Sequence, residues 1–400
     1  MKRFLILLLL LCSLGAAAQG SRDDGLWFIS KTHPVQKQGF TEGDAYVFSR
    51  PVGTLPAGTF VQFGVTLENS GEKAPMHYLV EFYDGGNWVA DPDFVYDDGL
   101  ASCSFTTVSS SVKHPSVYMA VYRLRNAVSD TLKVRCRVCS KYAADGSLLD
   151  AGEAENVSAL RTRKYVGACL RPLGTEQPRK TYSVLLVGNS FTYYFGEPFM
   201  LQEIAFSQSV QLNIRASLKG GQTFRQHCGL EMTKRTIGQG AYDFAFLQGQ
   251  SQEPARYAAD KCANSDVEAS FVELCKLVRA SSPDCNVFVE NTWGYPAKDN
   301  GGFASLEEFD RLLEDGSRQL ARAGLAGRTR VGQAYVEARE RVQLLDTDDK
   351  HPGLAGAYLK ACVTYLTITG KPFSGAVANC GLPEEEAAYL RSVAEKLYRD

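Results

Sequence analysis

The sequence lacks an apolar run long enough to cross a bilayer, because a membrane-spanning helix needs about 20 residues. Its most apolar segment, residues 4–11, comes directly after a basic pair and is followed by small residues that end at Ala18. This order of basic, apolar and small residues is typical of a secretory signal peptide. We therefore expect residues 1–18 to be a signal peptide, and the mature chain to act in the periplasm or outside the cell, without a membrane span.

A surplus of charge of either sign is also missing. The chain carries 43 Lys and Arg against 45 Asp and Glu, which gives a net charge of −2 at pH 7, and its basic residues form no cluster. Proteins that bind nucleic acids usually present a basic patch to the phosphate backbone. Nucleic acid is therefore not expected as a partner.

A second cysteine pair is missing as well, so the lone Cys136-x-x-Cys139 motif does not predict a zinc site. Structural zinc sites combine four Cys or His ligands, and no His pair lies near this motif. Residues three apart in a strand also point to opposite faces of the sheet. We expect no metal, and we expect most of the eleven cysteines to be buried, although the expected export leaves disulfides open.

The length of the mature chain predicts two domains, because about 380 residues exceed the usual ~100 to 200 residues of one domain. Residues 19–168 consist of short β-type runs separated by turn residues such as Asp, Gly and Asn, which predicts an all-β sandwich. Residues 169–180 contain Pro172, Gly174 and Pro178, and we predict that they form a linker.

Residues 181–400 alternate apolar strands with helical patterns. This predicts a doubly wound, mainly parallel five-stranded sheet between two layers of helices, as in flavodoxin-like folds. In this architecture active sites form at the carboxyl ends of the strands. The predicted strands are 182–187, 212–217, 244–248, 287–291 and 329–332, and the predicted helices are 197–207, 267–280, 306–323, 354–369 and 384–398.

Two short motifs supply the groups that a serine nucleophile needs. Ser190 ends the segment Gly188-Asn189-Ser190 directly after the first predicted strand, although such residues also form ordinary turns. Asp348 and His351 are three residues apart, so in a tight turn the carboxylate can hold the imidazole Nδ1 and leave Nε2 facing a substrate. The alternatives are a solvated acidic turn and Asp349 as the partner of His351.

Together, Gly188-Asn189-Ser190 and Asp348-x-x-His351-Pro352 resemble blocks I and V of the SGNH/GDSL hydrolase superfamily. They are most similar to a bacterial branch that carries Gly-Asn-Ser-Phe-Thr and Asp-Asp-x-His-Pro motifs. The resemblance covers roughly residues 182–375. It implies a catalytic triad in which Ser190 is the nucleophile, His351 the general base and Asp348 the residue that orients the imidazole. Acyl transfer by such a triad needs no metal or organic cofactor.

The resemblance also implies an oxyanion hole. The segment 217–223 is similar to block II of the superfamily, whose glycine corresponds to Gly221, and the segment 247–251 stands where block III usually has Asn. The expected donors are the N–H groups of Ser190 and Gly221 and one side-chain amide. Gln250 is the first candidate for that amide, and Gln248 is the alternative.

Three further residues are candidates for substrate binding. They are Asn189 beside the nucleophile, His227 after the second block, and Trp293 after the fourth predicted strand. Trp293 could stack on a sugar ring or simply pack beneath a loop. His227 could line the pocket or form structural hydrogen bonds.

The sequence therefore predicts an exported serine esterase that removes acetyl or other short acyl groups from carbohydrate through an acyl-enzyme on Ser190. The substrate class rests on the expected export, the second β domain and the glutamine in block III. A lipase or thioesterase, or an acyltransferase of the same fold, would use the same groups. A glycan-binding protein without catalysis is the alternative from a different class, but it would not need the intact set of Ser190, Asp348 and His351.

Overall fold

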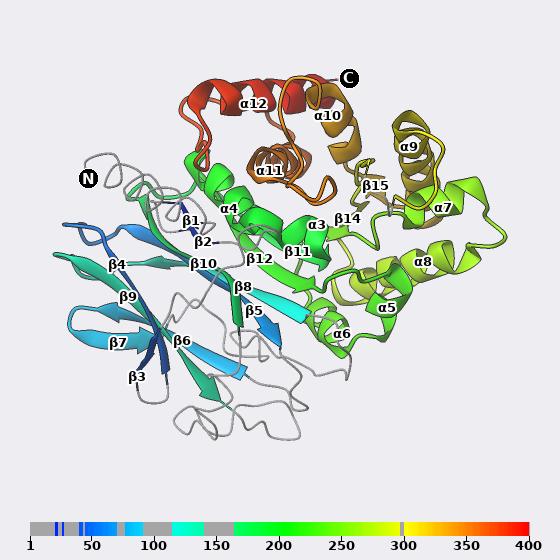
Figure 1. The fold of residues 1–400 in the computed structure, drawn as a ribbon. Coiled ribbons are helices and arrows are strands. Elements are labelled where there is room, and N and C mark those ends of the chain that lie inside the picture. The colour runs from blue at the N-terminus through cyan, green and yellow to red at the C-terminus, as the bar shows by residue number, and fades with distance from the viewer. Residues whose placement is uncertain are drawn as a thin grey trace, which may run out of the picture.

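The computed structural model describes residues 21–22, 26–27, 40–42, 45–69, 77–90, 114–139, 164–296 and 300–399. The predicted signal peptide, residues 1–18, lies outside them. Within these ranges the chain forms a β-rich N-terminal domain and a C-terminal domain of alternating strands and helices (Figure 1). None of the described helices is both long and apolar enough to cross a membrane.

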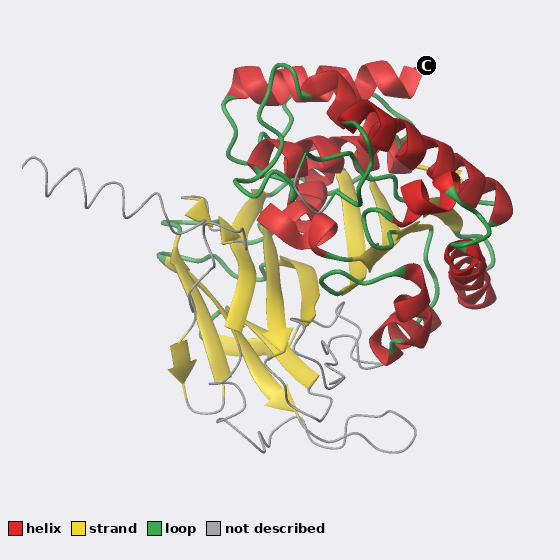
Figure 2. Cartoon of the chain, turned by 45° about the vertical axis from the view of Figure 1, so that its right-hand side comes forward, coloured by secondary structure: helices red, strands yellow, loops and turns green. Residues whose placement is uncertain are grey.

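The N-terminal domain is a β-sandwich of two antiparallel five-stranded sheets, as predicted. Its strands are β1 (Ser21–Arg22), β2 (Leu26–Trp27), β3 (Phe40–Glu42), β4 (Ala45–Pro51), β5 (Phe60–Asn69), β6 (His77–Asp84), β7 (Asn87–Ala90), β8 (His114–Arg123), β9 (Thr131–Cys139) and β10 (Lys164–Gly174). One sheet has the order β1-β2-β10-β5-β8 and the other the order β3-β4-β9-β6-β7. Figure 2 shows the two sheets facing each other. Between them, Phe82 of β6 stacks on Tyr122 of β8 with ring centroids 4.4 Å apart.

The connection between the domains is shorter than the predicted linker, 169–180. Strand β10 continues to Gly174 and the next strand begins at Lys180, so only residues 175–179 lie between them. Pro172 fits near the end of β10 because the register with β5 shifts between Pro172 and Gly174, and proline is tolerated at such irregularities. In this segment Pro and Gly mark the irregular end of a strand.

The C-terminal domain contains a five-stranded parallel sheet with helices on both faces, which confirms the predicted doubly wound architecture. Its strands are β11 (Lys180–Gly188), β12 (Val210–Leu218), β13 (Phe244–Leu247), β14 (Asn286–Val289) and β15 (Gly327–Arg328). Its helices are α3 (Ser190–Tyr193), the 3₁₀ turn η1 (Tyr194–Gly196), α4 (Glu197–Ser207), α5 (Phe224–Gly229), α6 (Glu231–Gly238), α7 (Glu253–Ala259), α8 (Ser265–Ser281), α9 (Leu306–Ala323), α10 (Val331–Ala338), α11 (Leu354–Thr369) and α12 (Glu384–Arg399). The order β12-β11-β13-β14-β15 reverses its winding between β11 and β13, where ligands bind in such sheets.

The last predicted strand, 329–332, is wrong. Strand β15 occupies the two residues before this segment, and helix α10 begins at Val331. The buried residues Val331, Ala334, Tyr335 and Ala338 are spaced three or four apart, which is the period of a helix. The segment 329–332 is too short to show that period by itself. The sequence pattern also did not reveal the short helices α5, α6 and α7.

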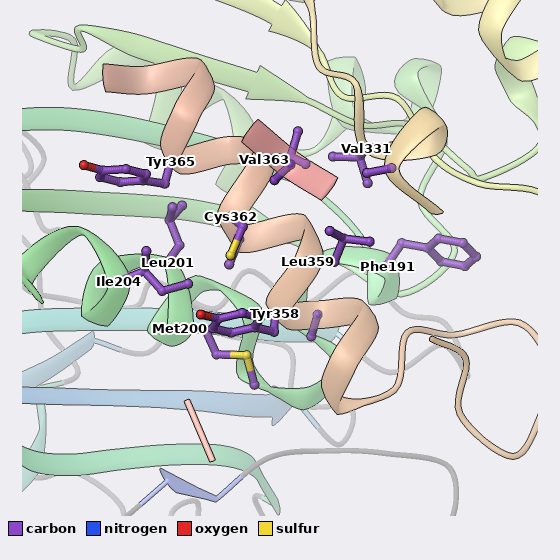
Figure 3. Close-up of a cluster of buried hydrophobic side chains, with 14 of the residues drawn as sticks. Phe191, Met200, Leu201, Ile204, Val331, Tyr358, Leu359, Cys362, Val363 and Tyr365 are labelled. Atoms are coloured by element: carbon purple, nitrogen blue, oxygen red, sulfur yellow. The ribbon is translucent and has the colours of Figure 1, made fainter. Parts of the chain in front are cut away.

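The central strand β11 contributes side chains to two hydrophobic cores. Val184 and Leu186 join the core that includes α4, α10, α11 and α12, whereas Leu185 and Val187 join the core that includes α5, α6 and α8. Alternate residues of a strand point to opposite faces, so a strand that is buried on both faces is apolar throughout. Figure 3 shows the first of these cores, in which apolar side chains of α11 and α4 meet.

The two domains pack on each other through β8 and β12 and through helix α4. The fully buried Gln62 of β5 donates from Nε2 to the carbonyl of Phe199, at 3.0 Å, and to Oε1 of Gln202, at 2.7 Å. Arg171 of β10 forms an ion pair with Glu203. Helix α4 thus contacts both the sandwich and α11, between which it lies in Figure 1.

Candidate active site

The loop after β11 presents Ser190 at the carboxyl edge of the sheet. Asn189 follows β11 directly and caps the one-turn helix α3, of which Ser190 is the first residue. The Asn189 Oδ1 accepts a hydrogen bond from the Phe191 N–H at 3.1 Å. Its Nδ2 donates to the carbonyls of Gly249, at 2.7 Å, and Gln222, at 3.3 Å. Asn189 is 2% exposed, so it positions the turn around Ser190, and its predicted contact with substrate is corrected to this role.

Ser190, His351 and Asp348 form a continuous chain of hydrogen bonds. The Nε2 of His351 lies 2.8 Å from the Oγ of Ser190, although the two residues are 161 positions apart in the sequence. The Nδ1 of His351 lies 2.6 Å from the Oδ2 of Asp348. Because an ionised carboxylate only accepts, Nδ1 carries the proton and Nε2 is left to accept from the Ser190 hydroxyl. This is the arrangement in which an imidazole can deprotonate a serine nucleophile.

Asp348, and not the alternative Asp349, is the partner of His351. Its Oδ1 also accepts from the backbone N–H of His351, at 2.9 Å, and of Lys350, at 3.2 Å. Burial acts to raise the pKa of Asp348, but the hydrogen bonds and the charge of His351 outweigh burial and lower the pKa below its ordinary value. The carboxylate is therefore ionised at neutral pH. Asp349 occupies the left-handed region with φ of 54°, at the turn between the two triad residues.

Aromatic rings fix the plane of the His351 imidazole. The ring of Tyr194 stacks on the imidazole with centroids 4.1 Å apart and an angle of 16° between the planes. Trp293 acts one layer further away: it stacks on Phe191 and on Tyr335, with centroid distances of 4.7 and 3.9 Å. Trp293 is 1% exposed, so its predicted role in stacking on a sugar is wrong. A buried ring has no free face for a ligand.

His227 does not line the site either. It is fully buried, with Nε2 at 3.1 Å from the carbonyl of Gly188 and Nδ1 at 3.0 Å from the Oγ1 of Thr233. Burial lowers the pKa of His227 to about 3, although the bond to Gly188 opposes this shift. The ring is therefore neutral, and its contact with the Gly188 carbonyl supports the end of β11. The structural alternative considered for His227 is the correct one, and the prediction that it binds substrate is wrong.

Two backbone N–H groups are available for an oxyanion. Among the described residues, no hydrogen-bond acceptor takes the N–H of Ser190 or of Gly221. Gly221 has φ of 68°, and a Cβ built on it would meet no atom within 4 Å, so the space beside it is open. Both groups follow neighbouring strands, β11 and β12, at the same edge of the sheet.

Hydrogen bonding distinguishes the two glutamines. The amide of Gln248 is 1% exposed and already donates to Oδ1 of Asn189, at 2.8 Å, while its Oε1 accepts from Thr192 at 2.6 Å. The Oε1 of Gln250 accepts from the backbone N–H of Gln252, at 2.8 Å, whereas its Nε2 has one hydrogen bond among the described residues, to the Oγ of Ser251 at 3.4 Å. Gln250 is therefore the glutamine with an amide group to offer a ligand.

Glu253 is a site residue that the sequence analysis missed. Its Oε2 accepts from the backbone N–H of Gln250, at 2.7 Å, and of Phe224, at 3.0 Å, so it ties the loops after β12 and β13 together. Burial raises the pKa of Glu253 to about 7. A Cβ on Gly249 would lie 2.1 Å from the Glu253 carboxylate, which explains the glycine. An acidic residue in a polar loop gives no sequence signal for this role.

A buried charged cluster lies behind the nucleophile turn. It consists of Lys360, Glu290 and Glu197, each at most 3% exposed. The Nζ of Lys360 lies 3.0 Å from Oε2 of Glu290 and 3.9 Å from Oε2 of Glu197. Burial raises the pKa of Glu197 to about 8, with Lys360 opposing the rise and Glu290 adding to it. Glu197 is therefore mostly protonated at neutral pH. We call these three residues the Lys360 cluster.

Comparison with known proteins finds similarity in three-dimensional structure only. No family model matches the chain, and no curated protein matches its sequence. A DUF4886 family protein from Bacteroides uniformis is 19% identical, over 55% of this chain and 96% of its own, with a TM-score of 0.45. A proposed SGNH hydrolase from Slackia heliotrinireducens is 23% identical, over 47% of this chain and 99% of its own, with a TM-score of 0.39. Axe2, an acetylxylan esterase from Geobacillus stearothermophilus, is 14% identical, over 47% of this chain and 94% of its own, with a TM-score of 0.36.

Proposed function

We propose that this chain is a serine esterase that works through an acyl-enzyme on Ser190. The observation that carries the proposal is the chain of hydrogen bonds from Ser190 Oγ through His351 to Asp348, with distances of 2.8 and 2.6 Å. Side chains this far apart in sequence meet here in the order and orientation that nucleophilic catalysis requires. A protein that only binds glycans has no need of this geometry.

The geometry supports a two-step reaction. Ser190 Oγ attacks the ester carbonyl while His351 Nε2 accepts the hydroxyl proton, and Asp348 stabilises the imidazolium that forms. The N–H groups of Ser190 and Gly221 and the amide of Gln250 then stabilise the oxyanion. The alcohol leaves with the proton from His351. Water, deprotonated in turn by His351, then attacks the carbonyl of the acyl-enzyme. The bond between the acyl group and Ser190 Oγ breaks, the acid leaves, and His351 returns the proton to Oγ.

For the substrate, we propose a short acyl group, such as acetyl, on a carbohydrate outside the cytoplasm. Ser190 and His351 are each only 9% exposed, which favours a small acyl group at the nucleophile. The proposed export and the accessory β-sandwich support a carbohydrate as the alcohol. The substrate class is a proposal built on the site and on the sequence, and acyl chain length is its most direct test.

An ester series tests this function. We expect the purified protein to hydrolyse 4-nitrophenyl acetate with a kcat/KM at least about tenfold above that for the octanoate, equal to ~1.4 kcal/mol of discrimination. It should also release acetate from acetylated oligosaccharides. A preference for octanoate would favour a lipase or thioesterase, and acetyl transfer to a sugar ahead of water would favour an acyltransferase. A folded protein that cleaves none of these esters would contradict the proposal.

Gln250→Ala tests the oxyanion hole. We expect kcat for aryl acetate to fall by ~10²–10³ with little change in KM, because the lost hydrogen bond forms mainly in the transition state. Gln250→Glu is the matched variant, since its side chain can still accept from the Gln252 backbone but cannot donate. It should lose at least as much activity. Retention of kcat within twofold in Gln250→Ala would show that this amide does not contact the oxyanion.

A further inference from the structure

The nucleophile turn is too short to hold its own conformation. Helix α3 contains only four residues, and a single helical turn is unfavourable by itself because nucleation fixes several dihedral angles for one hydrogen bond. At its N-terminal end the turn is capped by Asn189, as described above. At its other end, the Lys360 Nζ donates to the carbonyl of Phe191, at 3.2 Å, and to the Oγ1 of Thr192, at 2.8 Å. A cation at this end also complements the helix dipole.

Lys360 belongs to the segment that carries the general base. Helix α11 begins at Leu354, three residues after His351, and runs through the core shown in Figure 3. The ammonium group of Lys360 therefore joins a rigid, buried helix that follows His351 to the turn that contains Ser190.

The charge of Lys360 also sets the direction of the hydrogen bonds around the turn. An ammonium group only donates, so the Thr192 hydroxyl accepts from it and gives its own proton to Oε1 of Gln248, at 2.6 Å. The Gln248 amide then donates to Oδ1 of Asn189 at 2.8 Å. This order leaves the Asn189 amide free to donate to the carbonyl of Gly249. The bond from the Phe191 N–H to Oδ1 selects the same orientation of the Asn189 amide.

The electrostatics of the Lys360 cluster are consistent with a fixed cation. A buried lysine is costly unless a carboxylate pairs with it, and Glu290 lies at salt-bridge distance. Burial raises the pKa of Glu197, which favours the neutral form of this carboxyl group beside the Lys360–Glu290 pair. Buried ion pairs contribute little net stability compared with well-packed apolar side chains. We therefore expect the Lys360 cluster to act mainly by fixing the position of the Ser190 turn, and less by stabilising the fold.

We propose that Lys360 is a positioning residue that holds the Ser190 turn at hydrogen-bonding distance from His351. Lys360 touches neither substrate nor reacting atoms and acts through Phe191 and Thr192. The inference rests on the proposed esterase function, because its readout is the reactivity of Ser190. It predicts that the loss of this contact lowers kcat and leaves substrate binding unchanged.

The test compares Lys360→Met, Thr192→Val and the double variant with Leu366→Ala as a control. Leu366 is a core residue of the same helix, 1% exposed, so its truncation lowers stability without touching the turn. We expect Lys360→Met to lower kcat for 4-nitrophenyl acetate by about 10- to 100-fold, the scale of an ångström-sized misplacement, with KM within twofold. Inactivation by a serine-reactive phosphonate should slow by the same factor. The Leu366→Ala variant should keep its kcat at temperatures where it is folded.

The double variant distinguishes positioning from general destabilisation. Because both single changes break the contact between Lys360 and Thr192, we expect the loss in the double variant to be smaller than the product of the two single losses. A kcat of Lys360→Met within twofold of the unchanged protein, or losses in the two single variants that simply multiply, would overturn the inference. If Lys360→Met does not fold, an unchanged kcat in Thr192→Val would overturn it equally. Absence of hydrolysis by the unchanged protein would instead reject the proposed function itself.

Discussion

Ser190→Ala is expected to lower kcat for aryl acetate hydrolysis by about 10⁶-fold, which is the scale seen when a triad nucleophile is removed. The Ser190 hydroxyl is the group that the His351 imidazole contacts, at 2.8 Å. The change removes the nucleophile but keeps the backbone N–H of residue 190 in place. Substrate should still bind, so KM should change little, and stability should change only by the ~1 kcal/mol of one hydrogen bond. Burst kinetics with 4-nitrophenyl acetate would report the loss of the acyl-enzyme directly.

Ser217→Ala provides the matched control for this prediction. Ser217 is also a buried serine near the end of a strand of the same sheet, but its Oγ lies 2.8 Å from the Oγ1 of Thr233 and does not contact a histidine. Its removal should leave kcat within a fewfold. If Ser190→Ala kept more than about one hundredth of the activity, the residual rate would exceed what an oxyanion hole alone supplies, and the acyl-enzyme mechanism would be rejected.

Asp348→Asn is expected to lower kcat by about 10⁴-fold at neutral pH, because an amide can donate to the imidazole and so select the wrong tautomer. In that tautomer Nε2 carries the proton and can no longer accept one from Ser190. Asparagine keeps an oxygen for the backbone N–H groups of His351 and Lys350, which Asp348 now binds. The turn should therefore stay folded, and the measured loss should be in kcat and not in melting temperature.

The neighbouring residue gives the control for this second variant. Asp349→Asn changes the same charge one position away, at a left-handed φ of 54° that asparagine adopts readily. We expect its kcat to stay within twofold of the unchanged protein. Equal losses in the two variants would show that net negative charge near His351 matters, and not the specific bond from Asp348 Oδ2.

The hydrogen-bonded arrangement of Ser190, His351 and Asp348 could be predicted because each of its parts is local in sequence. Ser190 follows an apolar strand directly, and Asp348 and His351 share one turn, so neighbouring residues alone reveal them. The position of Ser190 follows from topology, since parallel strands bring their carboxyl ends to one edge of the sheet. The turn with Asp348 and His351 lies between α10 and α11, so the strand pattern alone does not place it there. The choice between Gln248 and Gln250 required the structure, because it depends on which amide already has a partner.

The other residues could not be assigned from the sequence because their environment is set by distant segments. Trp293 stands at the end of a strand, as a ligand-binding ring would, but Phe191 and Tyr335 cover its two faces. Lys360 occurs in an otherwise apolar helix. The sequence around it does not indicate that Glu290, directly after β14, and Glu197, at the start of α4, lie beside its ammonium group. Burial of this kind is a property of three-dimensional packing and leaves no local pattern.

The packing of α4 against the sandwich has a consequence for how the chain can be divided. This helix starts immediately after the turn that carries Ser190, and its Gln202 and Glu203 find their partners, Gln62 and Arg171, in the other domain. Separating the two domains would remove these contacts and expose the Gln62 and Gln202 side chains, which are buried in the whole chain. We therefore expect the C-terminal domain to be less stable when it is produced without the sandwich.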